Sequence, residues 1–119
     1  MWIYNQSNGT FSKNGHFIGH GYSGFGVGKN NPALQNLVGV GPIPEGSYEI
    51  GPPHDTTTHG PHVMALSPEE GTDTFGRGGF LIQGDSIEHP GTASHGCIVL
   101  ADDLRVQVSS SSDTQLRVI

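Results

Sequence analysis

The sequence predicts a mainly β domain with one or two short helices, and three features point to that fold class. The chain of 119 residues contains 19 glycines and eight prolines, which are typical of the turns between strands. Its apolar residues fall in short runs rather than in long helical periods. The chain is long enough for a modest core, although its hydrophobic content of 33 % is low. At this length we expect a single domain over residues 1–119.

Turn signals separate the first strands. Apolar residues at 2–4 and at Phe11 flank Ser7-Asn8-Gly9, which predicts a first hairpin. Asn14-Gly15 favours a type I′ turn, and a strand over residues 16–20 follows it.

Glycine and proline dominate the next segment. Residues 21–31 predict a mobile surface loop, because they lack the strand–loop–helix context of a phosphate-binding loop. Asn31 as N-cap and Pro32 at the first helical position predict one or two helical turns. A rigid Gly-Pro turn over residues 41–46 then leads into a strand over residues 47–50.

The second half of the chain predicts four more strands, over residues 63–66, 80–83, 98–100 and 115–119. Loops are expected over residues 54–62 and 67–79, which are rich in polar residues and glycine. Asp102 or Asp103 can cap a short helix over residues 103–109.

Charge and hydropathy exclude several classes of function. The net charge is −6, and the five Lys and Arg residues are dispersed, so no nucleic-acid partner is expected. No run of 18 apolar residues is present, so no membrane span is expected. The first residues lack the basic and apolar regions of a signal peptide, and synthesis in the cytoplasm without one is therefore expected.

Cys97 is the only cysteine of the chain, and it lies in Ser94-His95-Gly96-Cys97 at the start of an apolar run. It has no internal disulfide partner, so it serves packing or chemistry. A free cysteine often packs as a small hydrophobe. In an extended segment, however, His95 and Cys97 share a face, and an imidazole beside a thiol favours a nucleophile. Both interpretations stay open from these residues alone.

Three histidines and Asp55 share the predicted loop over residues 54–62. His54, His59 and His62 are residues that zinc uses, but their spacing matches no compact zinc motif. Solvated histidines are the simpler interpretation, and neither a metal nor another cofactor is expected.

Two further groups of polar side chains flank the cysteine segment. Asp85, Glu88 and His89 combine carboxylates with an imidazole and can orient a base, or they can cap their own backbone. Arg77 lies among glycines, where its guanidinium can bind a substrate carboxylate or remain solvated.

Several motifs together resemble the L,D-transpeptidase (YkuD-like) family. Phe80-Leu81-Ile82-Gln83-Gly84-Asp85, followed by Ser94-His95-Gly96-Cys97, is similar to the catalytic signature of that family. The segment 41–48 is similar to its Thr-Pro-x-Gly-x-Phe/Tyr stretch. The resemblance is closest to the compact L,D-transpeptidase-like effectors of type VI secretion, whose other signatures resemble residues 28–33, 51–55 and 84–86.

The resemblance implies a YkuD-like β-sandwich or barrel and a cysteine enzyme acting on peptidoglycan stem peptides. Cys97 would attack the carbonyl between meso-diaminopimelate and the terminal D-alanine, giving an acyl-enzyme. Water would complete an L,D-carboxypeptidase reaction, and a free D-amino acid or a second stem would complete transpeptidation. The backbone N–H groups of Gly96 and Cys97 are candidates for the oxyanion hole.

The resemblance also implies residue roles, partners and a place of action. The catalytic segment would comprise Ser94, His95, Gly96, Cys97, Asp85 and position 83. The substrate-binding candidates are Arg77, Gly84, Ser86, His54 and Lys29. An effector of this kind is secreted, acts in the periplasm of the target cell and has a cognate immunity protein.

Position 83 departs from the family pattern, because Gln83 stands where the general-base histidine is expected. Glutamine does not take a proton from a thiol, whose pKa lies near 8.5. Three explanations remain open: an engineered inactive variant, a natural pseudoenzyme, or transfer of the base role to His95 or His89. The alternative function is a non-catalytic YkuD-like module that binds peptidoglycan or a protein partner.

Overall fold

Nine strands form one mixed sheet in the computed structural model, which describes residues Met1–Ile119, and the mainly β fold class is confirmed. One α-helix and two short 3₁₀ helices accompany the sheet. The elements are β1 (Trp2–Tyr4), β2 (Thr10–Lys13), β3 (His16–His20), β4 (Tyr22–Ser23), η1 (Gly26–Gly28), η2 (Pro32–Leu34), β5 (Gly46–Thr56), β6 (Gly60–Pro68), β7 (Leu81–Gln83), β8 (Ile98–Val99), α1 (Asp102–Ser110) and β9 (Gln115–Val118).

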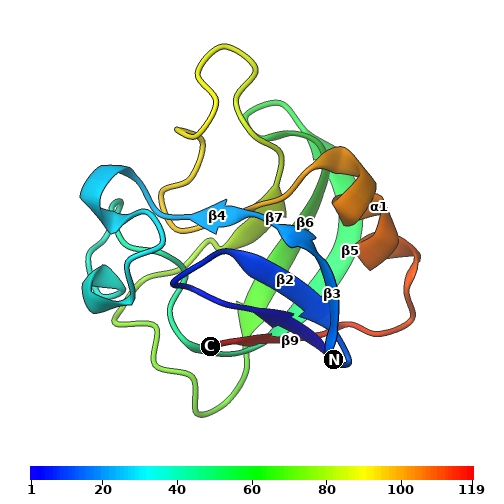
Figure 1. Ribbon diagram of the computed structural model, residues 1–119, viewed down its shortest axis with the longest axis horizontal. Helices are drawn as coiled ribbons and strands as arrows, with labels where there is room; N and C mark the ends of the chain where they lie inside the picture. Colours follow the sequence, from blue (N-terminus) through cyan, green and yellow to red (C-terminus); the bar gives the residue numbers. More distant parts are fainter.

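The sheet rolls until its two edges lie next to each other. Its strand order is β3-β2-β1-β9-β5-β6-β7-β8-β4, with β1–β9 and β7–β8 parallel and the other pairs antiparallel. The edge strands β3 and β4 are separated in sequence by Gly21 alone and follow one another in space (Figure 1). A Cβ atom at Gly21 would lie 2.2 Å from the Val99 carbonyl oxygen, so this junction requires glycine.

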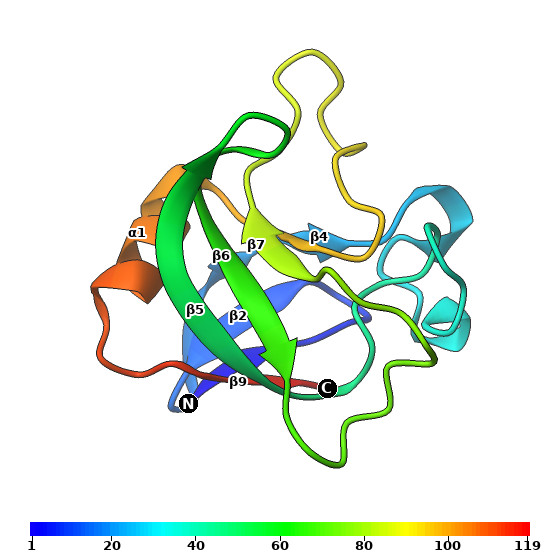
Figure 2. The ribbon, with the colours of Figure 1, turned by 180° about the vertical axis from the view of Figure 1, so that it is seen from behind.

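One cluster of 16 buried apolar residues fills the interior of the rolled sheet. Trp2 stacks on Phe11 at 5.3 Å between ring centroids, and Tyr48 meets Phe80 edge-on at 5.9 Å. Burying each such aromatic side chain contributes about 1.5–3 kcal/mol. The helix α1 lies against the long β5–β6 hairpin (Figure 2). None of the helices is long and apolar enough to cross a membrane.

The turn and capping predictions for the first third of the chain are confirmed. Asn14 and Gly15 both have positive φ, at 50° and 83°, as a type I′ turn requires. The side chain of Asn31 accepts a hydrogen bond from the Ala33 N–H at 3.2 Å and thereby caps η2.

Three local predictions are wrong. Residues 54–62 are mostly strand: Thr56 accepts the His59 N–H, and register shifts let the β5–β6 hairpin continue past its prolines. Residues 21–31 are not simply a surface loop, because β4 pairs with β8 there and Ser23 is fully buried. Neither Asp102 nor Asp103 caps α1, since Ala101 occupies the N-cap position.

Candidate functional site

The turn over residues 94–97 is fixed by Ser94, whose side chain is fully buried. Its Oγ accepts hydrogen bonds from the Gly24 N–H at 2.9 Å and the Gly96 N–H at 3.2 Å. It donates to the Cys97 carbonyl oxygen at 2.6 Å. Ser94 therefore positions the turn against the β4 region, and the Gly96 N–H is occupied, whereas the Cys97 N–H has no partner.

Cys97 lies just before β8, and its half-buried thiol faces a pocket of about 340 Å³. The pocket wall comprises Val38, Gly39, His59, Gly76, Arg77, Gly78, Gly79, Phe80, His95 and Gly96. Burial raises the pKa of the Cys97 thiol, although the Leu81 N–H and the Arg77 charge oppose the shift. The thiol is therefore mainly protonated at neutral pH, and its use as a nucleophile requires a base.

Arg77 supports this pocket from behind, and its side chain is only 8 % exposed. Its guanidinium donates to four backbone carbonyl oxygens: those of Gln35 (2.5 Å), Pro42 (2.8 Å), Gly41 (3.0 Å) and His95 (3.3 Å). Burial lowers its pKa. The contacts of Arg77 are thus committed to the chain itself, where it joins the 35–42 segment to the cysteine turn.

Gly96 of the cysteine turn lies directly over Arg77. Its φ is 135°, a region that favours glycine, and a Cβ atom there would lie 2.5 Å from Arg77 Nη2. The glycine of the Ser-His-Gly-Cys motif is therefore required by both backbone conformation and space.

Gly96→Ala is expected to lower the free energy of unfolding by about 1–3 kcal/mol, because it combines backbone strain with this contact. Urea denaturation followed by tryptophan fluorescence measures the change. Gly78→Ala is the matched control, since a Cβ atom at Gly78 meets nothing within 4 Å. Equal stability of the two variants would contradict the expectation.

His95 shares the pocket with Cys97 but does not hydrogen-bond to it. Its Nδ1 lies 2.9 Å from the Gly39 carbonyl oxygen, and its ring stacks on Phe25 at 5.0 Å. Because a carbonyl accepts only from an N–H, Nδ1 carries the proton and Nε2 is left as the basic nitrogen.

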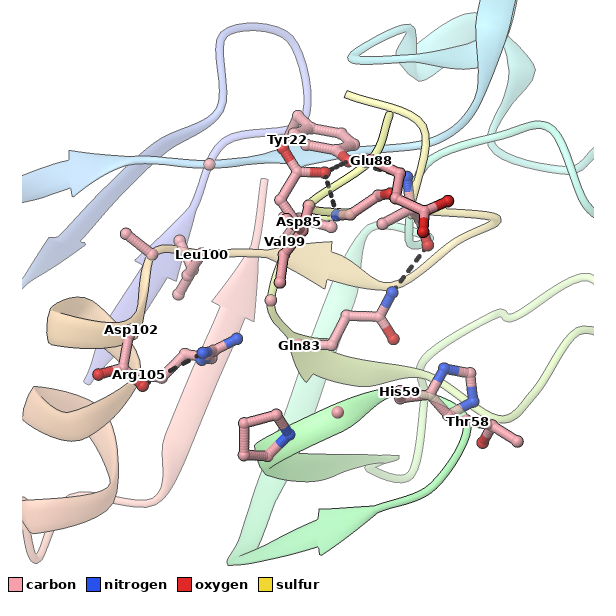
Figure 3. A pocket seen from close by; sticks show the side chains of 18 of the residues that line it. Tyr22, Thr58, His59, Gln83, Asp85, Glu88, Val99, Leu100, Asp102 and Arg105 are labelled. Carbon is pink, nitrogen blue, oxygen red and sulfur yellow. Dashed lines mark hydrogen bonds and ion pairs between the residues drawn. The ribbon is translucent and has the colours of Figure 1, made fainter. Parts of the chain in front are cut away.

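Gln83 is the last residue of β7 and is 4 % exposed. Its Nε2 donates to the Ala93 carbonyl oxygen at 2.7 Å, whereas its buried Oε1 has no partner (Figure 3). Gln83 pairs with Val99 in the parallel ladder, so Cys97, two residues earlier, lies diagonally on the same face. Strand spacing places the two Cα atoms about 8 Å apart. The order of the two motifs predicts Gln83 within hydrogen-bond reach of the Cys97 thiol, but the structure has no hydrogen bond between these two side chains.

Gln83 lines a second, larger pocket of about 1100 Å³, which shares His59 with the Cys97 pocket. Asp85 on its wall accepts hydrogen bonds from the Tyr22 hydroxyl at 2.5 Å, the Ser86 N–H at 2.8 Å and the Gly91 N–H at 3.0 Å. Burial opposes ionisation of Asp85, but these bonds and Lys29 outweigh it and hold its pKa below the usual range. Asp85 therefore orders the loop after β7 and does not contact Gln83.

Tyr22 completes this arrangement. Burial and the bond to Asp85 raise its pKa to about 12, and Lys29 Nζ lies 4.6 Å from its ring centroid. Lys29 thus packs on the Tyr22 ring and lines neither the larger pocket nor the Cys97 pocket.

Of the remaining candidates from the sequence, some line the larger pocket and others line neither pocket. Gly84 and Ser86 line the larger pocket, and Ser86 Oγ accepts the His89 N–H at 3.0 Å. His54 lines neither pocket; its Nδ1 lies 3.4 Å from the Pro52 carbonyl oxygen. His89 also lines neither pocket.

Sequence analysis missed the position of His59, which it considered only as a metal ligand. His59 lies at the turn of the β5–β6 hairpin and lines both pockets. Its position follows from the length of β5 and β6, which makes residues 57–59 the turn of the hairpin. The sequence, read as a loop over residues 54–62, carries no signal for this. No group of three or more His, Cys, Asp or Glu side chains is placed to hold a metal ion.

Comparison with protein families gives one match. The family model described as the Tlde1 domain covers residues 18–117 and therefore includes every pocket residue described above. No curated protein matches the chain significantly.

Proposed function

Because the chain belongs to the Tlde1 domain family of type VI secretion effectors, we propose that it acts on peptidoglycan as a cysteine L,D-carboxypeptidase and transpeptidase. The observation that carries the proposal is the Cys97 thiol on a pocket wall beside an unpartnered Cys97 N–H and the Arg77 charge. A nucleophile, an oxyanion donor and a nearby cation are the parts that acyl transfer needs.

The proposed reaction begins with transfer of the Cys97 proton to a base. The thiolate attacks the carbonyl carbon between meso-diaminopimelate and D-alanine, and the developing oxyanion accepts the Cys97 N–H. The base then returns this proton to the leaving nitrogen as the carbon–nitrogen bond breaks, D-alanine leaves with a free amine, and a thioester remains on Cys97. Water or the amine of a D-amino acid attacks the thioester and restores the thiol.

The base is the open part of this mechanism, because Gln83 cannot accept the proton. Two imidazoles line the Cys97 pocket, those of His95 and His59. His95 is the first candidate, since the Gly39 carbonyl fixes its tautomer and it lies two residues from Cys97. The proposal further places the site of action in the target-cell periplasm and includes an immunity protein as partner.

Incubation with disaccharide tetrapeptides tests the function directly. We expect the chain to remove D-alanine slowly and to form an acyl adduct on Cys97, which mass spectrometry of substrate and intact protein detects. Cys97→Ala should abolish both signals, because the thiol supplies the covalent bond. D-alanine release that is unchanged in Cys97→Ala would overturn the proposal.

A non-catalytic module is the second candidate, and Gln83 is the observation that favours it. Such a module would bind tetrapeptide stems without D-alanine release or adduct formation. For such a module, the Gln83→His variant should also release no D-alanine, which distinguishes it from the enzyme.

A further inference from the structure

The segment that ends in Cys97 is hydrogen-bonded to β4 and the residue after it at three successive points. The Gly24 N–H donates to Ser94 Oγ at 2.9 Å. Ser23 Oγ donates to the Gly96 carbonyl oxygen at 3.3 Å. Both serines are fully buried, so water does not compete for these two contacts. They fix the cysteine turn itself.

The third contact lies one residue before the turn and is made by the Tyr22 hydroxyl. This hydroxyl accepts a hydrogen bond from the Ala93 N–H at 3.0 Å. The carbonyl oxygen of Ala93 accepts from Gln83 Nε2 at 2.7 Å. Side chains therefore hold both polar groups of the residue that leads into Ser94. A displacement of Ala93 would be passed along the chain to the turn.

Asp85 determines how the Tyr22 hydroxyl is used. Its Oδ1 accepts the hydroxyl proton at 2.5 Å, which leaves an oxygen lone pair for the Ala93 N–H (Figure 3). Bonds to Asp85 hold its pKa low, and the pKa of Tyr22 is raised to about 12, so the carboxylate stays ionised and the phenol protonated at neutral pH. The ring is enclosed by Lys29, whose Nζ lies 4.6 Å from its centroid.

We propose that Tyr22 is a positioning residue for Cys97 and that Asp85 acts through it. The path runs from the Asp85 carboxylate through the Tyr22 hydroxyl to the Ala93 N–H, and then along the backbone to the thiol. Tyr22 does not line the Cys97 pocket, so its effect on the thiol has to pass through the backbone. That this positioning serves acyl transfer rests on the proposed function, whereas the hold on the thiol rests on the contacts alone.

Alkylation by iodoacetamide tests the hold on the thiol without any turnover. Cys97 is the only cysteine, so the mass increase of the intact protein reports its reaction alone. Tyr22→Phe should react about 2- to 10-fold faster at pH 7, because loss of a hydrogen bond raises the population of open conformers by about that factor. The midpoint of the pH profile between pH 6 and pH 10 should fall, because burial is what raises the pKa of the thiol.

Tyr48→Phe is the matched control, because it also removes a single tyrosine hydroxyl. That hydroxyl donates to the Pro44 carbonyl oxygen at 2.8 Å and has no contact with the cysteine segment. Tyr48→Phe should leave the alkylation rate and the pH midpoint of Cys97 unchanged, even where urea unfolding shows that it lowers stability as much as Tyr22→Phe does.

Two variants of Asp85 test whether it acts through Tyr22. Asp85→Asn keeps an oxygen that can accept the Tyr22 hydroxyl proton, so it should restore most of the original rate, whereas Asp85→Ala should react faster. Because both residues lie on one path, the combined effect of Tyr22→Phe and Asp85→Ala should be smaller than the product of the single effects.

Equal alkylation rates for Tyr22→Phe and Tyr48→Phe would overturn the proposal, and so would fully independent effects of Tyr22→Phe and Asp85→Ala. These outcomes do not depend on D-alanine release. A chain that releases no D-alanine but shows the expected alkylation rates would contradict the proposed function and support the positioning of Cys97 by Tyr22.

Discussion

Gln83→His is expected to raise D-alanine release from tetrapeptides by about 100-fold or more, the contribution of a positioned general base. Gln83 Nε2 already donates to the Ala93 carbonyl at 2.7 Å. An imidazole in its place can give one N–H to this carbonyl and keep its other nitrogen for the Cys97 proton. Because burial raises the pKa of Cys97, the gain should be largest near neutral pH and shrink at alkaline pH, where the thiolate forms unaided.

The controls for this expectation distinguish an imidazole at position 83 from that of His95. Cys97→Ala in the Gln83→His background should remove the gain completely. Gln83→Leu, which has no basic nitrogen, should give none. The rate of D-alanine release is measured by mass spectrometry between pH 6 and pH 10. Equal rates for the original chain and Gln83→His would place the base elsewhere, and His95→Gln would then be the variant that loses activity.

A second large effect is expected for Arg77→Met, which should lower the free energy of unfolding by about 3–5 kcal/mol. The Arg77 guanidinium donates hydrogen bonds to four backbone carbonyl oxygens, and methionine has no donor that could replace these bonds. Arg105→Met removes an equally buried arginine that lacks such partners, and it should cost little. Urea unfolding measures the free energy of unfolding of both variants. Similar losses in Arg77→Met and Arg105→Met would contradict the expected difference between the two arginines.

Turn chemistry and the cysteine motif were predictable because they depend on local sequence. Asn14-Gly15 needs positive φ wherever it occurs, and Asn31-Pro32 carries its own capping geometry. The Ser-His-Gly-Cys segment likewise identified the pocket that contains Cys97. The family assignment over residues 18–117 supports the expected effector class, whereas the catalytic chemistry stays a prediction.

The parts that sequence could not provide depend on distant contacts. Polar residues 54–62 look like a loop, yet side-chain bonds to backbone carry them into a hairpin that brings His59 over both pockets. Arg77 looked free among its glycines because its four acceptors lie 18 or more positions away along the chain. Arg105 carried no local signal, since only the approach of Gly84 to α1 makes it a pocket residue.

The place of β9 in the sheet has a consequence for how the chain folds. This last strand inserts between β1 and β5, and its pairing with β1 joins residues more than 100 positions apart. Contacts of such long range make folding slow, in the range of milliseconds to seconds for all-β domains of this size. As long as residues 115–118 are unpaired, the sheet is divided between β1 and β5, so the pairing of β9 is the step that joins the N-terminal strands to the rest of the sheet.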